Sequence, residues 1–194
     1  DWKDLVKPGV QVVTPNVQTS GGAKWNIMGA YGAMRKKGKT HAQAVAYLRR
    51  LYDHVVSQDK SAREALQTFL AGRGDVLLAY ENEAIFANSK GQEVPYVIPK
   101  ATIRIENPIA VTRNSQNKAT ANAFLRFLRT PTAQKIFAQN GYRPVVASAA
   151  RGFSFPVRPQ LFTIKYVGGW AKVDRQFFNA RTGIVTRIQQ RAGG

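Results

Sequence analysis

Residues 19–26, with the sequence Thr-Ser-Gly-Gly-Ala-Lys-Trp-Asn, decide the fold of this chain. They follow an apolar strand pattern over residues 10–13 and run straight into a helical pattern. A strand, a small-residue turn and a helix start leave free backbone N–H groups at the positive end of a helix dipole. Ser20 suits the N-cap, while Gly21 and Gly22 let the backbone approach a ligand without an intervening Cβ. The stretch predicts either an anion-binding turn or simply a capped helix.

The rest of the chain alternates helical and strand patterns. Thr40 with Gln43, and Ser61 with Glu64, form capping boxes that open two further helices. The apolar stripe of the first of these helices is expected to run from residue 44 to residue 55. Strands are expected over residues 75–80, 94–98 and 102–111, and helices over residues 81–86, 121–128, 130–140 and 170–178.

This alternation predicts an α/β fold, a three-layer sandwich with helices on both faces of a mainly parallel sheet. Ligands of such sheets bind at the carboxyl ends of the strands, beside helix N-termini. Three features fall at such ends: the Ser20–Gly22 turn, the Ser61–Ala62 helix start and Tyr80. Together they predict a pocket of uncharged hydrogen-bond donors.

Composition favours an anionic partner. The 194 residues include 29 Lys and Arg against 11 Asp and Glu, a formal charge of +18, and 44% are apolar. Such a balance favours nucleic acid, anionic lipid or small oxyanions. No apolar run reaches membrane-spanning length, and cysteine is absent, which removes disulfides and thiolate metal sites.

Several runs resemble the periplasmic sulfate-binding proteins of sulfate/thiosulfate ABC importers, which are type II periplasmic binding proteins. They occur in the family's order and span nearly the whole chain: residues 13–16, 19–26, 74–84, 142–144, 161–164 and 168–170. The family has two α/β lobes joined by a hinge, and it clamps a dehydrated sulfate between them. The resemblance implies that residues 8–106 form the second, anion-binding lobe. Residues 107–194 would form the mainly helical C-terminal part of the first lobe, whose opening segment is expected to be missing.

The resemblance also implies the ligand set. Ser20 would donate a hydroxyl to the anion, and Gly21, Gly22 and Ala62 would donate backbone amides. Arg63 would support the Ala62 region without touching the ligand. The family commonly has a tryptophan where this chain has Tyr80; tyrosine keeps a donor and adds acceptor capacity.

The chemistry of sulfate agrees with this set. At neutral pH sulfate carries no proton, so it only accepts hydrogen bonds, whereas protonated phosphate also needs an acceptor. A handful of charge-assisted hydrogen bonds, each contributing about 1.5–3 kcal/mol, would reach roughly −8 kcal/mol, a micromolar affinity, after the costs of association. The resemblance implies no cofactor and no metal.

An enzyme is not expected. His41 and His54 are well separated on one predicted helix, and Glu81 and Glu83, two residues apart, would not share a helix face. Zinc, Walker and nucleophile-elbow patterns are all missing from the sequence. No catalytic residue is therefore assigned.

Two other interpretations stay open. The charge of +18 could mark a nucleic-acid or polyanion-binding module, although the basic residues are scattered and no aromatic-basic RNA-binding motif occurs. The chain could also be a fragment with little intrinsic binding. Its expected partners are sulfate or a related tetrahedral oxyanion, the membrane permease of an ABC importer, and a second copy or a complementing N-terminal segment; nucleic acid is disfavoured. The expected location is the periplasm.

Overall fold

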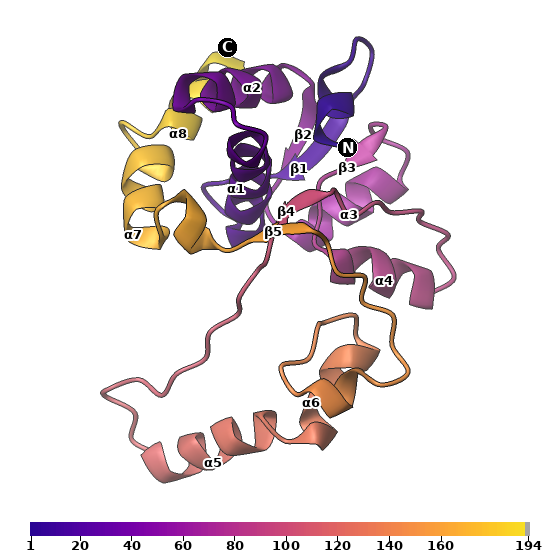
Figure 1. Ribbon diagram of the computed structural model, residues 1–194, viewed down its shortest axis with the longest axis vertical. Coiled ribbons are helices and arrows are strands. Elements are labelled where there is room, and N and C mark those ends of the chain that lie inside the picture. Colours follow the sequence, from indigo (N-terminus) through magenta and orange to yellow (C-terminus); the bar gives the residue numbers. More distant parts are fainter. Residues whose placement is uncertain (193–194) are drawn as a thin grey trace.

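The computed structural model describes residues 1–192, which form an α/β body with a smaller helical part beside it (Figure 1). In chain order its elements are η1 Trp2–Val6, β1 Val12–Pro15, α1 Gly21–Lys36, α2 His41–Asp53, β2 Val55–Asp59, α3 Ala62–Leu70, β3 Val76–Leu77, α4 Glu81–Ser89, β4 Ala101–Ile103, α5 Lys118–Leu128, α6 Pro131–Gln139, η2 Ala147–Ala150, β5 Gln160–Phe162, η3 Ile164–Val167, α7 Trp170–Val173, η4 Asp174–Phe178 and α8 Ile184–Ala192. None of the helices in this part of the chain is long and apolar enough to cross a membrane.

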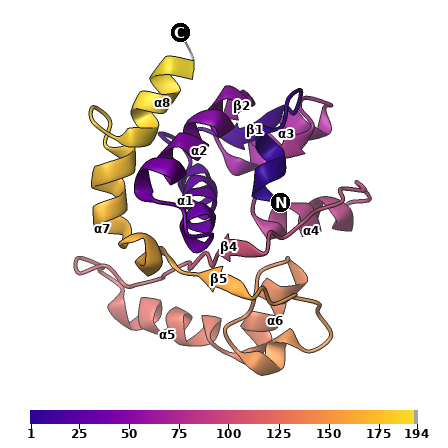
Figure 2. The same ribbon diagram turned by 45° about the horizontal axis from the view of Figure 1, so that its top comes forward.

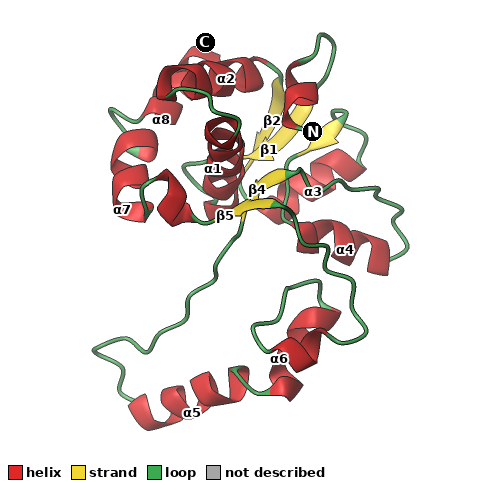
Figure 3. Ribbon diagram, in the orientation of Figure 1, coloured by secondary structure: helices red, strands yellow, loops and turns green. Residues whose placement is uncertain are grey.

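The main sheet has three parallel strands in the order β2-β1-β3, with β1 in the centre. The chain passes from β1 to its neighbour β2 through α1 and α2, and it then crosses back over β1 to β3 through α3. Right-handed crossovers then place α1 and α3 on opposite faces of the sheet, as Figure 3 shows. The α/β class with a parallel sheet agrees with the expectation from the sequence.

Helix α1 is the buried centre of the body, because small residues let its neighbours come close. A Cβ at Gly32 would overlap the ring of Phe162, and a Cβ at Gly29 would lie 3.3 Å from a methyl group of Ile103. Both neighbours belong to β4 and β5. The glycines therefore make room for a second sheet against this helix.

The second sheet joins distant parts of the chain. Strands β4 and β5 pair in parallel, with Ala101 opposite Gln160 and Ile103 opposite Phe162. After β5 the chain stays with the main body: Phe177 and Val185 belong to the same apolar core as α1 and α2. These contacts differ from the division expected at residue 107, since residues 160–192 pack with the first hundred residues.

Residues 107–158 form the smaller part, which Figure 2 shows beside the two strands β4 and β5. It contains α5, α6 and η2, and α5 has no buried residue. One of its contacts with the main body is at Gly141, where an added Cβ would lie 3.0 Å from Ile85 and 3.1 Å from the backbone of Asn82, both in α4.

Several expected elements were wrong in extent. No strand forms over residues 94–98, where Pro95 cannot donate to a ladder and Pro99 follows directly, and the strand expected over residues 102–111 is short. The helix expected to reach residue 55 ends earlier and gives way to β2, while α8 had no counterpart among the expected elements. Helix formation over residues 170–178 is divided between α7 and η4.

Candidate functional site

Three helix N-termini meet at the carboxyl edge of the main sheet. Helix α1 follows β1, α3 follows β2 and α4 follows β3. Because the three strands are parallel and adjacent, their following helices begin along the same edge. The first amides of each helix have no intrahelical acceptor and lie at the positive end of a dipole. This edge can therefore hold an anion.

Hydrogen bonds tie the three helix starts together. Thr19 donates its hydroxyl to the carbonyl of Lys60 at 2.8 Å, which links the turn before α1 to the turn before α3. Asn26, buried in α1, donates its side-chain amide to the carbonyl of Leu78 at 2.8 Å, which links α1 to the chain that enters α4. These bonds fix the relative positions of the amides.

Ser20, Gly22 and Tyr80 lie together, as the predicted pocket requires. A Cβ built at Gly22 would lie 3.2 Å from the Tyr80 hydroxyl oxygen and 3.3 Å from Ser20 Oγ. Gly21 faces open space, with no atom within 4 Å of an added Cβ. The turn after β1 thus brings two hydroxyl groups and the α1 amides to one place.

The hydroxyls of Ser20 and Tyr80 are not used as helix caps. Both residues occupy N-cap positions, of α1 and α4, but neither side chain bonds an amide of its own helix. Ser61, at the start of α3, behaves differently: its hydroxyl accepts from the amide of Glu64 at 3.2 Å. At the third helix start only the backbone amides, that of Ala62 first, remain for a ligand.

Tyr80 is held in its protonated form. Burial raises the pKa of its phenol, and the neighbouring Tyr142 and Glu83 raise this pKa further. At neutral pH Tyr80 therefore keeps the proton that a donor needs. Because the phenol oxygen also accepts hydrogen bonds, Tyr80 can serve a protonated oxyanion as well.

Arg63 binds α3 to α4 rather than pointing at the edge as a ligand. Its Nε lies 2.8 Å from Glu83 Oε2, and its Nη2 donates to Oε1 at 3.3 Å. Its guanidinium carbon also lies 4.0 Å from the ring centre of Phe86. Glu83, a buried carboxylate, receives a further bond of 3.2 Å from Asn82. Arg63 thereby holds the Ala62 arm against the helix that Tyr80 caps.

A second arginine links the smaller part to α4, and no sequence pattern predicted it. Arg143, in the smaller part, reaches Glu81 through Nε at 2.8 Å and through Nη2 at 2.9 Å. Its Nη2 also donates to the carbonyl of Pro156 at 3.0 Å. Glu81 is the first residue of α4, so this bidentate pair anchors the smaller part beside the site. A separation of 62 residues leaves no local pattern from which to find it.

Both histidines and Glu81 have structural partners. His41 Nδ1 lies 2.9 Å from the Tyr31 hydroxyl, and His54 Nδ1 lies 2.8 Å from the carbonyl of Val10. Glu81 pairs with an arginine of the smaller part, as described above. Within residues 1–192, no group of three or more His, Asp or Glu side chains could hold a metal ion.

Comparisons with known proteins identify the family of this chain. The family model for bacterial extracellular solute-binding proteins matches residues 1–143. Sulfate-binding proteins of Synechococcus elongatus and Escherichia coli are 42% and 40% identical, over 100% and 98% of this chain. A thiosulfate-binding protein of Pseudomonas aeruginosa is 34% identical over 92% of this chain.

Solved structures give the same result. The sulfate-binding protein SubI from Mycobacterium tuberculosis superimposes with a TM-score of 0.85 at 43% identity, covering 92% of this chain and 63% of SubI. A periplasmic thiamin-binding protein, at 17% identity and a TM-score of 0.65, shares the fold alone. The expected type II periplasmic-binding-protein fold is thereby confirmed.

The chain spans 57% of the Synechococcus protein's length and 61% of the Escherichia protein's length. The alignments nevertheless cover nearly all of this chain, and the family match covers most of it. The chain therefore belongs to the bacterial extracellular solute-binding proteins, and within them its similarity is to those that bind sulfate.

Proposed function

We propose that this chain binds sulfate or thiosulfate as part of the substrate-binding component of an ABC importer, without catalysis. The oxyanion lies at the carboxyl edge of the main sheet. Ser20 and Tyr80 donate hydroxyls to it, and Gly21, Gly22 and Ala62 donate backbone amides. Arg63 supports the Ala62 arm through its ion pair with α4.

One observation supports this proposal above the others. The hydroxyls of Ser20 and Tyr80, which cap neither of their helices, lie beside the glycine turn at the start of α1. Ser20 Oγ and the Tyr80 hydroxyl both lie within 3.3 Å of the Cβ position of Gly22. The proposed donor groups are all uncharged, and sulfate at neutral pH needs donors only. Such a site binds a dianion through its hydrogen-bond geometry rather than through opposite formal charge.

The names of the relatives support the same ligand class, because they include sulfate-binding and thiosulfate-binding proteins. The proposal extends to the setting of such proteins. The partner of the whole protein is the membrane permease of the importer, and the location is the periplasm.

Isothermal titration calorimetry with sodium sulfate tests the proposal. The parent chain should bind, and its affinity should change little between low and moderate sodium chloride, since a desolvated site is screened weakly. A polyanion-binding surface would instead lose affinity steeply with salt. Sulfate affinity that collapses with salt would contradict the proposed site.

Glycine variants locate the binding. Gly22→Val pushes against the Tyr80 ring and Ser20, and Gly21→Val fills the open space beside the turn, so both should abolish sulfate binding while circular dichroism stays unchanged. Ala119→Val, in exposed α5, is the matched control and should bind as the parent does. Parent-like binding by either glycine variant would remove the turn from the site.

A further inference from the structure

Two carboxylates lie in the first turn of α4, one of the helices that begin at the proposed oxyanion site. Glu81 directly follows Tyr80, and Glu83 is two residues further along the helix. A negative side chain suits a helix N-terminus that holds no ligand. Beside a bound dianion the same charge is repulsive, and a half-buried position screens this repulsion less than open water does. A sulfate site at this turn therefore needs both carboxylates neutralised.

Each carboxylate is paired with its own arginine, and the two arginines come from different parts of the chain. Arg63 of α3 holds Glu83. Arg143 of the smaller part holds Glu81, with its Nε 2.8 Å from Oε2. The Glu81 side chain is only 19% exposed and that of Arg143 is 40% exposed, so water screens this pair only in part. The charge at the first residue of α4 is thus controlled by a residue of the smaller part.

Contacts within the smaller part hold Arg143 in the orientation that reaches Glu81. Its Nη2 donates to the carbonyl of Pro156 at 3.0 Å, and its guanidinium carbon lies 5.5 Å from the ring centre of Phe155. Two residues earlier, Gly141 adopts a φ of 81° and packs directly against α4. The guanidinium is therefore positioned at the start of α4 by more than the ion pair itself.

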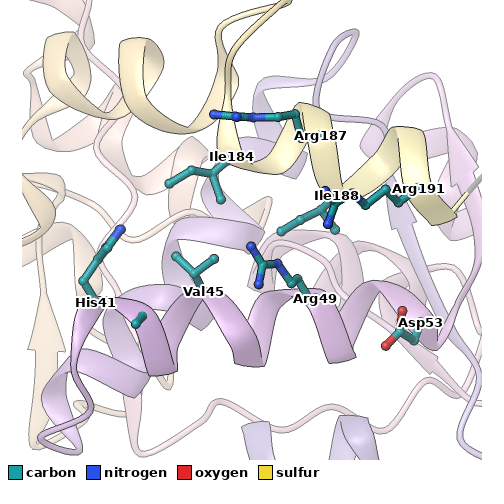
Figure 4. A pocket seen from close by; sticks show the side chains of 9 residues that line it. His41, Val45, Arg49, Asp53, Ile184, Arg187, Ile188 and Arg191 are labelled. Atoms are coloured by element: carbon teal, nitrogen blue, oxygen red, sulfur yellow. The ribbon is translucent and has the colours of Figure 1, made fainter.

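The other arginine-rich region of the protein does not serve this turn. Figure 4 shows Arg49 on α2 and, across a cavity of about 620 Å³, Arg187 and Arg191 on α8. None of these three pairs with a carboxylate of α4 in the described part of the chain. The general excess of positive charge therefore does not replace Arg143 at the start of α4.

Building on the proposed function, we propose that Arg143 is a positioning residue that sets the affinity for the oxyanion by acting through Glu81. Its guanidinium neutralises the Glu81 carboxylate, so the start of α4 presents a positive field to the dianion. Because Arg143 belongs to the smaller part, its withdrawal from α4 uncovers the charge of Glu81 and weakens anion binding. By linkage, a bound dianion favours the paired position of Arg143 to the same extent.

Sulfate calorimetry at low ionic strength on variants of this pair tests the inference. Arg143→Gln should weaken sulfate binding about three- to tenfold, because the unpaired Glu81 carboxylate repels the dianion. Arg143→Lys keeps the charge and should lose less. Glu81→Gln should bind at least as tightly as the parent, since it removes the carboxylate and leaves the arginine. Combining Arg143→Gln with Glu81→Gln should restore the affinity to within about twofold of the parent.

The matched control is Arg104→Gln, which breaks an exposed pair with Glu106 and should bind sulfate as the parent does. If the ion pair acts only as an anchor, Glu81→Gln and Arg143→Gln break the same bonds. Equal weakening by these two variants, with no recovery in the double variant, would therefore overturn the inference.

Salt and the parent chain separate the remaining outcomes. The loss in Arg143→Gln should shrink as sodium chloride is raised, and a loss that salt leaves unchanged would contradict an electrostatic cause. Parent-like binding by Arg143→Gln contradicts the role of Arg143 alone. A parent chain that binds no sulfate contradicts the proposed function itself, and the role of Arg143 with it.

Discussion

At the scale of single residues, Tyr80 is the most informative position of the proposed site. Tyr80→Phe removes one donor to the oxyanion and should lower sulfate affinity by about 1.5–3 kcal/mol, measured by calorimetry. Tyr80→Trp supplies an indole N–H and should recover part of this loss. Because a phenol also accepts, the parent should bind hydrogen phosphate better, relative to sulfate, than the Trp variant does.

The control for this prediction is Tyr166→Phe, which removes the hydroxyl of an exposed tyrosine on η3. Its affinities for sulfate and hydrogen phosphate should equal those of the parent. Unchanged affinity for both anions in Tyr80→Phe would exclude Tyr80 as a ligand. The raised pKa of Tyr80 implies that deprotonation removes the donor only above the ordinary phenol pKa, so sulfate affinity should not fall between pH 7 and pH 9 through this residue.

Local signals made the residues of the glycine turn predictable. Ser20, Gly21 and Gly22 are adjacent in the sequence, and their conformation is decided by the strand before them and the helix after them. That Tyr80 reaches Gly22 could be inferred only from strand order, and the clamp of Arg143 on Glu81 could not be inferred at all. Long-range ion pairs depend on how complete elements pack, which a single sequence does not encode locally.

At the scale of elements, the ion pair between α3 and α4 should stabilise both. Among residues 1–192, Arg63→Ala leaves the buried carboxylate of Glu83 with its neighbour Asn82 as the one side-chain donor, an unfavourable state. Because Arg63 itself is 45% exposed, we expect a loss of about 1–2 kcal/mol in the free energy of unfolding, together with weaker sulfate binding. Urea denaturation measures the first effect and calorimetry the second.

An exposed arginine pair provides the comparison for Arg63. Arg104 lies 2.8 Å from Glu106, and both side chains are about half exposed. Arg104→Ala should therefore change the free energy of unfolding by less than about 1 kcal/mol and leave sulfate binding intact. Equal destabilisation by the two variants would mean that the pair between α3 and α4 has no special role.

The contact between α1 and β5 is a second test at this scale. Gly32→Ala places a methyl group inside the volume of the Phe162 ring, so the ring and β5 must shift. We expect a net destabilisation of about 1–3 kcal/mol, although alanine favours the helix. Gly21→Ala, in the same helix, meets open space and should not destabilise. A parent-like melting temperature for Gly32→Ala would show that β5 does not pack as described.

Helices were predictable where a capping pattern of a few adjacent residues marks their start. The capping box of Thr40 with Gln43 forms in full, and Thr130 caps α6 through the amide of Ala133. Strands were less predictable, because a strand needs a partner. Residues 94–98 have strand composition but find no neighbour, whereas β2 begins two residues after α2 because β1 is available beside it.

At the scale of the whole molecule, the smaller part should mediate self-association. Phe124 and Phe127 in α5 and Ile136 in α6 are 54%, 48% and 52% exposed, an unusual apolar surface for neighbouring helices. We propose that a second copy covers it. Sedimentation velocity should show a concentration-dependent dimer, which Phe124→Ser with Phe127→Ser should abolish, while Val97→Ser, which removes an exposed apolar residue elsewhere, should leave it unchanged. A monomer at high concentration would contradict this prediction.

The parallel α/β architecture could be predicted from the sequence, because the strands and helices of each βαβ unit appear as alternating apolar patterns along the chain. The return of residues 160–192 to the main body could not, since it depends on β5 pairing with β4 across the chain. Exposed apolar positions of α5 and α6 are also invisible to periodicity, which marks an apolar face without saying what covers it.

The pairing of β4 with β5 has a consequence for engineering. Ile103 and Phe162 are partners in one ladder, so the points where residues 104–159 depart and rejoin are neighbours in space. Because the two ends of residues 104–159 lie close together, this segment can be replaced by another domain while the main body keeps its fold. A fluorescent protein grafted at this junction would label the chain while keeping Ser20, Gly22 and Tyr80 in place, and it would release Glu81 from its pair with Arg143.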